Sequence, residues 1–179
     1  PTGPYLHIGH AMGIRALRIL QKLGHEVIIL VGDFTAIAGD PSDGKIRKIM
    51  TPEEINKNME GWKQQASQLI DFDGDNPAKF LKNSEWLSKL NLQDLINLMS
   101  KTTVQQMLER DLFQRKLKDL TPIGLHEFIY PLMQGYDSVA MDVDLEIGGN
   151  DQIFNMLMGR NLMRVLKNKE KFVRGHELM

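Results

Sequence analysis

The most constraining feature of this sequence is a short apolar run, Glu26 to Val31, that follows a longer helix-periodic stretch. The run reads Glu-Val-Ile-Ile-Leu-Val and is rich in β-branched residues. It predicts a strand covered on both faces, as in a parallel sheet, because a half-exposed strand would alternate apolar and polar residues. Further strand-like runs alternate with helical patterns. The sequence therefore predicts an α/β fold with a doubly wound, Rossmann-like parallel sheet.

Composition excludes several classes of protein. The chain has 179 residues, enough for one α/β domain with a substantial core. Its formal net charge is −1, so any RNA contact must come from a local patch. Cysteine is absent, which excludes disulfides and thiolate metal sites and fits a reducing compartment. The sequence has no secretory signal and no apolar run of about 18 residues, so we expect a cytoplasmic protein with no membrane span.

Capping signals and periodicity predict the elements. The first helix runs from about Leu6 to Leu23 and stops at Gly24. Thr51, Pro52 and Glu54 predict a helix start with a capping box. We expect helices over 51–70, 84–89, 92–100 (capped by Asn91), 103–117, 125–139 (kinked or broken at Pro131) and 151–166. Strands are expected over 26–31, 79–81 and 144–147.

Two segments carry no helix or strand signal. Residues 32–44 follow the first strand and are expected to form a loop at the carboxyl edge of the sheet, where ligand crevices open. Residues 175–179 show no pattern of a terminal element. Because the chain also opens inside what should be a loop and lacks an initiator methionine, we interpret it as a piece of a longer protein.

The first ten residues carry the clearest functional signal. A turn-rich opening leads to His7 and His10, with Gly9 between them. If a helix begins near Leu6 or His7, both imidazoles lie on one face of its first turn. Free backbone N–H groups and the helix dipole favour a phosphate there, so the pair indicates an anion site. The alternative is that each histidine is satisfied by ordinary hydrogen bonds. A metal site is disfavoured, because no third ligand lies at suitable spacing nearby.

A second segment places polar groups on one face of a predicted helix. Tyr130, Gln134 and Asp137 are spaced by four and three positions, so a phenol, an amide and a carboxylate share that face. Such a stripe in an apolar segment costs stability unless something satisfies it. It is either an internal hydrogen-bond network or part of a binding site.

A third segment, Gly148-Gly149-Asn150-Asp151-Gln152, follows a predicted strand. The two glycines allow close backbone approach of another molecule. Asp151 then stands at a predicted helix start, where it would act either as an N-cap or as an acceptor for ribose hydroxyls.

Together these segments resemble the tyrosyl-tRNA synthetases, a family of class I aminoacyl-tRNA synthetases. The resemblance covers nearly the whole chain, because the segments match in order and at fitting distances. They are Pro1-Thr2-x-x-x-Leu6-His7-Ile8-Gly9-His10, Gly39-Asp40-Pro41-Ser42, Gln134-Gly135-Tyr136-Asp137 and Gly148-Gly149-Asn150-Asp151-Gln152. The resemblance implies an enzyme that activates tyrosine with ATP to tyrosyl-adenylate and transfers it to tRNA(Tyr).

The resemblance also implies a role for each site residue. ATP would be bound by Thr2, His7, Gly9, His10, Gly149 and Asp151. From their place in the loop after Gly44, Lys45 and Arg47 either reach the pyrophosphate or are solvated side chains of that loop. The α-ammonium group of tyrosine would be held by Asp40, Tyr130 and Gln134, and its phenolic hydroxyl by Asp137. The residues nearest the chemistry would be Thr2, His7, His10 and Gln152. Mg²⁺ would share the phosphate charge without a dedicated protein site.

By the same resemblance, residues 1–179 are one catalytic domain truncated at both ends, with a helical insertion at about 84–120 through which a homodimer forms. A strand before Pro1, a second signature loop beyond Met179 and an anticodon-reading domain would be missing, so we expect weak turnover or none from this piece. The alternatives are a tryptophanyl-tRNA synthetase, a small-molecule nucleotidyltransferase with the His-x-Gly-His site, and a non-enzymatic dimerisation or binding module. The triad of Tyr130, Gln134 and Asp137 favours a phenol over an indole.

Overall fold

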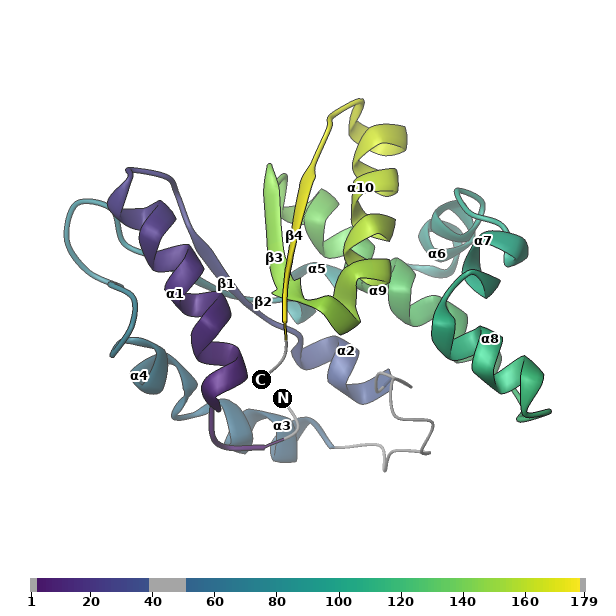
Figure 1. The fold of residues 1–179 in the computed structure, drawn as a ribbon, viewed down its shortest axis with the longest axis horizontal. Coiled ribbons are helices and arrows are strands. Elements are labelled where there is room, and N and C mark those ends of the chain that lie inside the picture. Colours follow the sequence, from purple (N-terminus) through teal and green to yellow (C-terminus); the bar gives the residue numbers. More distant parts are fainter. Residues whose placement is uncertain (1–2, 39–50, 178–179) are drawn as a thin grey trace.

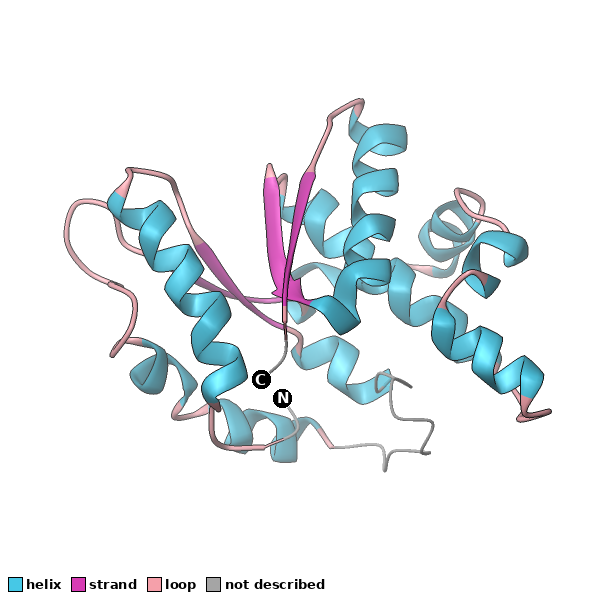
Figure 2. Cartoon of the chain, in the orientation of Figure 1, coloured by secondary structure: helices cyan, strands magenta, loops and turns pink. Residues whose placement is uncertain are grey.

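The computed structural model describes residues 3–38 and 51–177, in which strands alternate with helices (Figure 1). The strands are β1 (Ile28–Val31), β2 (Lys79–Lys82), β3 (Leu145–Gly149) and β4 (Phe172–His176). They form two parallel pairs, β1 with β2 and β3 with β4, which are the magenta arrows of Figure 2. The predicted parallel α/β architecture is confirmed, and its strands lie in two separate sheets.

Ten α-helices connect or flank the strands within the described ranges. They are α1 (Ile8–Lys22), α2 (Asp33–Ala38), α3 (Pro52–Met59), α4 (Trp62–Ala66), α5 (Ser84–Leu87), α6 (Leu92–Met99), α7 (Val104–Leu108), α8 (Asp111–Lys118), α9 (Leu125–Met141) and α10 (Ile153–Lys167). In Figure 1, α1 lies on one side of β3 and β4, and α9 and α10 lie on the other. Within the described ranges, no helix is long and apolar enough to cross a membrane.

Local capping chemistry forms the helix starts where the sequence predicts them. The Thr51 hydroxyl accepts from the Glu54 N–H at 3.2 Å, and the Glu54 carboxylate accepts from the Thr51 N–H at 2.9 Å. Asn91 and Asp94 form the same reciprocal pair at the start of α6. Gly24 follows α1 with a φ of 88°, a conformation that favours glycine. These predictions are confirmed.

Two predicted helices are broken in the structure, and of the kink or break expected at Pro131 the break does not occur. The helix expected over 51–70 divides into α3 and α4 next to Gly61, a residue of low helix propensity. The helix expected over 103–117 divides into α7 and α8, because Arg110 has an extended backbone with ψ of 127°. The break directs Phe113 into the core, where it is fully buried. Conversely, α9 continues through Pro131, which is itself buried.

Two elements were not predicted. The segment after β1 was expected to be a loop, but it forms α2, whose first residue Asp33 accepts hydrogen bonds from Phe34 N–H at 2.9 Å and from the Ser84 hydroxyl at 2.7 Å. The chain end was expected to lack an element, but Phe172–His176 forms β4 in register with β3. Both depend on partners distant in sequence, which a local pattern does not reveal.

Helix α4 holds the segment that leads into α1. The Trp62 indole N–H donates to the Gly3 carbonyl at 3.1 Å. The Gln65 side chain donates to the Pro4 carbonyl at 2.9 Å and accepts from the Leu6 N–H at 2.8 Å. The start of α1 is therefore fixed by α4, although nearly 60 residues separate them in the sequence.

Helices α9 and α10 approach each other closely at Gly135. A Cβ atom on Gly135 would lie 3.0 Å from Leu162 Cδ1 and 3.1 Å from the backbone nitrogen of Gly159. Gly135 follows Gln134, whose side chain accepts a hydrogen bond from Asn155 of α10 at 3.0 Å, so this close contact lies beside that hydrogen bond.

We expect Gly135→Ala to destabilise the full-length protein by about 1–3 kcal/mol, because an extra methyl group in a packed interior displaces its neighbours. The matched control is Gly13→Ala in the middle of α1, where the new Cβ would lie 3.6 Å from His176 Cε1, an ordinary contact. That variant should gain up to about 1 kcal/mol from helix propensity. Denaturant unfolding measures both, and equal effects would contradict the close-packing argument.

Candidate active site

The two histidines of the opening segment build the N-terminus of α1. His7 is the N-cap, and its Nδ1 accepts a hydrogen bond from the Gly9 N–H at 3.1 Å. His10 Nδ1 accepts from the His7 N–H at 3.1 Å, which completes a reciprocal capping box. The two rings lie 3.9 Å apart between centroids. The predicted helix start and the shared face of the imidazoles are confirmed.

This capping fixes which ring nitrogen carries the proton. A neutral imidazole has one acceptor nitrogen and one N–H donor. Because Nδ1 accepts a hydrogen bond in both His7 and His10, the proton lies on Nε2 in both rings. Desolvation and the neighbouring His7 ring lower the pKa of His10, which favours its neutral form at pH 7. The helix N-terminus therefore carries two Nε2–H donors as well as its own backbone N–H groups.

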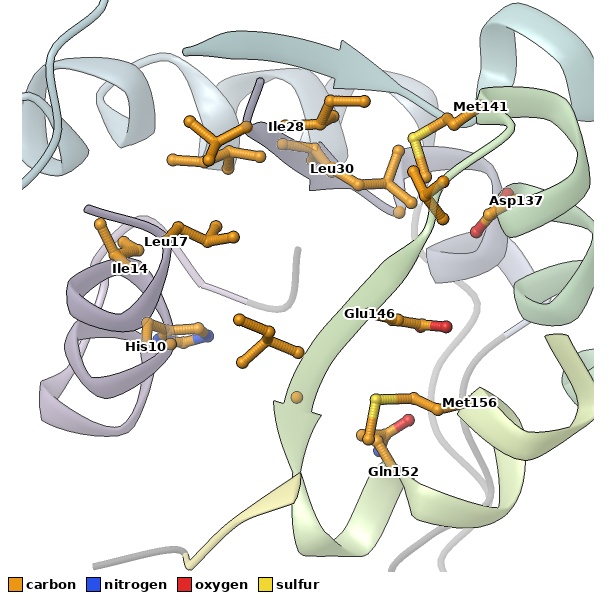
Figure 3. A pocket seen from close by; sticks show the side chains of 18 of the residues that line it. His10, Ile14, Leu17, Ile28, Leu30, Asp137, Met141, Glu146, Gln152 and Met156 are labelled. Carbon is orange, nitrogen blue, oxygen red and sulfur yellow. The ribbon is translucent and has the colours of Figure 1, made fainter. Parts of the chain in front are cut away.

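A cavity of about 1220 Å³ lies between α1, β1, β3 and the inner face of α9. Figure 3 shows His10 and the apolar side chains of α1 on one side and Asp137, Glu146 and Gln152 on the other. The structure brings together nine of the predicted site residues along its wall: His7, Gly9, His10, Tyr130, Gln134, Asp137, Gly149, Asp151 and Gln152. The histidines thus share one cavity with the polar face of α9.

Asp137 is a buried acceptor at the α9 side of this cavity. Its side chain is only 4% exposed, and its two oxygens accept from Trp86 Nε1 at 2.7 Å and Asn83 Nδ2 at 3.2 Å. Burial raises the pKa of Asp137 to about 7, against the lowering effect of the Trp86 and Asn83 hydrogen bonds. The nearby carboxylates of Glu146 and Asp33 raise it further. Near neutral pH, a bound ligand that donates a hydrogen bond to Asp137 would therefore shift this carboxyl towards its ionised form.

A buried asparagine connects the second and third segments. Asn155 is fully buried, and its Nδ2 group donates to Gln134 at 3.0 Å and to Gln152 at 2.9 Å. It therefore fixes both amide side chains relative to each other. The internal hydrogen-bond network is present at Gln134, and the side chains of the polar stripe also line the cavity, so the binding-site interpretation stays a prediction.

Asp151 does not cap a helix. It lies inside the 3₁₀ turn Asn150–Gln152 that separates β3 from α10, and α10 has Gln152 as its N-cap residue without a side-chain capping bond. The expected helix start near Asp151 is therefore shifted to Ile153. The exposed Asp151 side chain receives a hydrogen bond from Gln152 Nε2 at 3.0 Å.

Four predicted residues, Thr2, Asp40, Lys45 and Arg47, lie outside the described residues. Among the residues that are described, no group of three or more His, Asp or Glu side chains is arranged to hold a metal ion.

The whole sequence, residues 1–179, matches the family described as tRNA synthetases class I (W and Y). The chain belongs to this family of class I synthetases. It is 46% identical to a tyrosine–tRNA ligase of Geobacter metallireducens over 97% of this chain and 42% of that protein. It is 50% identical to the tyrosine–tRNA ligase of Carboxydothermus hydrogenoformans over 92% of this chain and 39% of that protein. The chain thus spans about two fifths of the length of these relatives.

Solved structures share the fold of this synthetase chain. A truncated mitochondrial tyrosyl-tRNA synthetase of Coccidioides posadasii aligns with a TM-score of 0.83 at 22% identity, covering 100% of this chain and 57% of that one. A tyrosyl-tRNA synthetase of Archaeoglobus fulgidus, solved with L-tyrosine, aligns with a TM-score of 0.69 at 24% identity, covering 98% and 52%. Family membership excludes the alternative of a small-molecule nucleotidyltransferase.

Sequence reasoning missed three residues that shape the site of this synthetase: Asn83, Trp86 and Asn155. Asn83 and Trp86 follow directly after β2, at the carboxyl end of a parallel strand, where ligand crevices open. That rule identifies the segment once β2 is recognised. The Asn83 amide is oriented by the Phe34 N–H, which donates to its oxygen at 2.9 Å and so directs Nδ2 towards Asp137. No sequence pattern identifies Asn155, because its role depends on the packing of α10 on α9.

Proposed function

We propose that the full-length protein is a tyrosine–tRNA ligase, which forms tyrosyl-adenylate from tyrosine and ATP and transfers the tyrosyl group to tRNA(Tyr). The observation that carries this proposal is Asp137, a buried carboxylate that faces a cavity whose other side carries the paired imidazoles, and that would accept a hydrogen bond from a donor on an aromatic substrate. A phenolic hydroxyl donates to such an acceptor and removes the cost of burying its charge. The names of the relatives at 46–50% identity agree with this choice.

On the nucleotide side, the tyrosine carboxylate attacks the α-phosphorus of ATP, and pyrophosphate leaves. The Nε2–H donors of His7 and His10 would stabilise negative charge on the transferring phosphoryl group, with no covalent enzyme intermediate. Mg²⁺ carried by the ATP phosphates would share this charge. We propose that Gly149 and Asp151 contact the adenosine, and we assign phosphate contacts to Thr2, Gly9, Lys45 and Arg47.

On the amino-acid side, the substrate ammonium needs carboxylate and neutral acceptors. We propose that Gln134 and Tyr130 supply neutral acceptors and that Asp40 supplies the charge. Gln152, held by Asn155, would lie beside the reacting carboxylate. The cavity would then order tyrosine with its hydroxyl at Asp137 and its carboxylate towards α1.

We also propose that a strand preceding Pro1 lies between β1 and β3 in the full-length protein. Each of these strands is hydrogen-bonded to one neighbour only within the described ranges, and both line the same cavity. The side chains of β1 and β3 are mostly half-buried, whereas the inner strands of a parallel sheet are buried on both faces. An added strand would form backbone hydrogen bonds with the free edges of β1 and β3. It would also reduce the cavity to the part that polar side chains line.

A homodimer through the helical insertion at about 84–120 remains part of the proposal. Apolar side chains are exposed over α6 to α8 and the start of α9, and these are Leu92, Ile96, Met99, Val104, Leu117, Leu120 and Leu125. Several large apolar side chains exposed on consecutive helices would be covered if two copies of the chain paired there. Sedimentation of the full-length protein as a monomer would exclude it. The cytoplasmic location stays a prediction.

The proposed function is tested by ligand-dependent thermal unfolding of the full-length protein. We expect tyrosine at 100 times its Kd to raise the free energy of unfolding by about 2.7 kcal/mol. Phenylalanine at the same concentration should produce almost no shift, because its ring offers no hydrogen-bond donor to Asp137. Equal stabilisation by tyrosine and phenylalanine would exclude this mode of recognition, and stabilisation by tryptophan alone would favour the alternative specificity.

A further inference from the structure

Lys171, the residue before β4, is buried, and it has no role in the proposed formation of tyrosyl-adenylate. It is 1% exposed. Its ammonium group donates to the carboxylate of Glu146, to Ser138 Oγ at 2.7 Å and to the Met156 carbonyl at 3.1 Å. Because an ammonium has three N–H donors, this set satisfies it completely. Lysine is almost never buried unless it is paired in this way.

The neighbouring backbone leaves room for this amine. A Cβ atom on Gly159 of α10 would lie 2.5 Å from Lys171 Nζ and 2.8 Å from Ser138 Oγ, so a side chain there would displace the amine or the hydroxyl. Arg160 Nε donates to the Lys171 carbonyl at 2.8 Å and fixes the backbone of the lysine. The fold therefore holds the ammonium group in one place.

The network reaches the cavity through Glu146. This residue projects from β3 and lines the cavity wall, between Asp137 and Gln152 in the view of Figure 3. Its Oε2 atom accepts from both Lys171 and the Ser138 hydroxyl, the latter at 3.2 Å. Ser138 follows Asp137 directly on α9. One network thus joins β3, α9, α10 and the start of β4 next to the buried acceptor.

Two carboxylates face Asp137 from the elements packed around it. Asp33 faces it from α2 and Glu146 from β3, while Asn83 and Trp86 contribute neutral donors. The Asp33 carboxylate is satisfied by the Phe34 N–H and by Ser84. Among the residues described, Lys171 is the cation that pairs with Glu146, and none forms an ion pair with Asp137.

We propose that Lys171 is a positioning residue for tyrosine recognition, which holds Glu146 as an ion pair on the cavity wall so that Asp137 accepts the substrate hydroxyl as a carboxylate. The inference rests on the proposed function, because it requires a hydroxylated ligand. Without the ammonium, Glu146 and Asp137 would be two uncompensated carboxylates that compete for one proton. Lys171 acts through Glu146 and touches no substrate.

The test measures the KM for tyrosine and for ATP in pyrophosphate exchange by the full-length enzyme from pH 6 to pH 9. In Lys171→Met, the midpoint of the tyrosine profile should move up by about one pH unit, because unpaired Glu146 keeps the proton on Asp137. At pH 7 the KM for tyrosine should rise about fivefold and the KM for ATP less than about twofold. The double variant Glu146→Gln/Lys171→Met removes both charges and should return the midpoint to the wild-type value or below it.

Glu146→Gln alone keeps the inference testable if Lys171→Met does not fold. It removes the carboxylate that faces Asp137, so the midpoint should move to lower pH. An unchanged midpoint in Lys171→Met or in Glu146→Gln would overturn the inference, as would a double variant as impaired as Lys171→Met. A wild-type enzyme without tyrosine-dependent exchange would overturn the proposed function itself, whereas failure confined to the variants overturns only the role of Lys171.

Discussion

Replacing Asp137 with asparagine is expected to stabilise the ligand-free protein and to weaken tyrosine binding. Burial raises the pKa of this carboxyl from 3.8 to about 7, which costs the folded state about 4 kcal/mol at pH 8. An asparagine carries no charge, so the variant should be more stable at pH 8 by up to about 4 kcal/mol. It should bind tyrosine roughly tenfold to hundredfold more weakly, because a hydrogen bond to a charged acceptor is lost.

The stability difference between Asp137→Asn and wild type depends on pH, and the raised pKa of Asp137 fixes the direction of that dependence. The folded protein holds more protons on this carboxyl than the unfolded chain between pH 3.8 and about 7, so wild-type stability rises as pH falls through that range. The stability difference between variant and wild type should therefore shrink from pH 8 to pH 4. Denaturant unfolding and tyrosine titration of the full-length protein measure the two effects. The exposed Asp119→Asn is the control, and a stability difference independent of pH would exclude a raised pKa.

Replacing His7 with alanine in the full-length enzyme is expected to slow tyrosyl-adenylate formation by about 10²–10³-fold, with little change in tyrosine affinity. The reason is that one preorganised donor to the charge developing on the phosphoryl group is removed. Single-turnover formation of the adenylate measures the rate separately from substrate binding.

A second substitution at this position separates catalysis from helix capping. His7 is also the N-cap of α1, and its loss costs about 1 kcal/mol of stability. Asparagine is a preferred N-cap, so His7→Asn keeps the cap but removes the Nε2–H donor. We expect His7→Asn to be as slow as His7→Ala while recovering stability, with the exposed His126→Ala as a neutral control. A fast His7→Asn enzyme would show that the ring only caps the helix.

The candidate site could be predicted from the sequence where its residues lie close together in the chain. His7 and His10 share a helix turn, and Tyr130, Gln134 and Asp137 share a helix face, so local periodicity was enough to place them. The capping box at Thr51 was predictable for the same reason. By contrast, Asn83 and Trp86 reach Asp137 from more than 50 residues away. Their role follows from the docking of α9 beside the end of β2.

The sequence by itself determined the α/β class, the helix starts and the chemical types of the polar side chains, because spacing and capping act over a few residues. Only the tertiary structure decided the rest. It paired Phe172–His176 with β3, broke the helix at Arg110 so that Phe113 entered the core, and buried Lys171 against Glu146. Strand pairing, burial and charge compensation depend on groups brought together by the fold, so no local pattern specifies them.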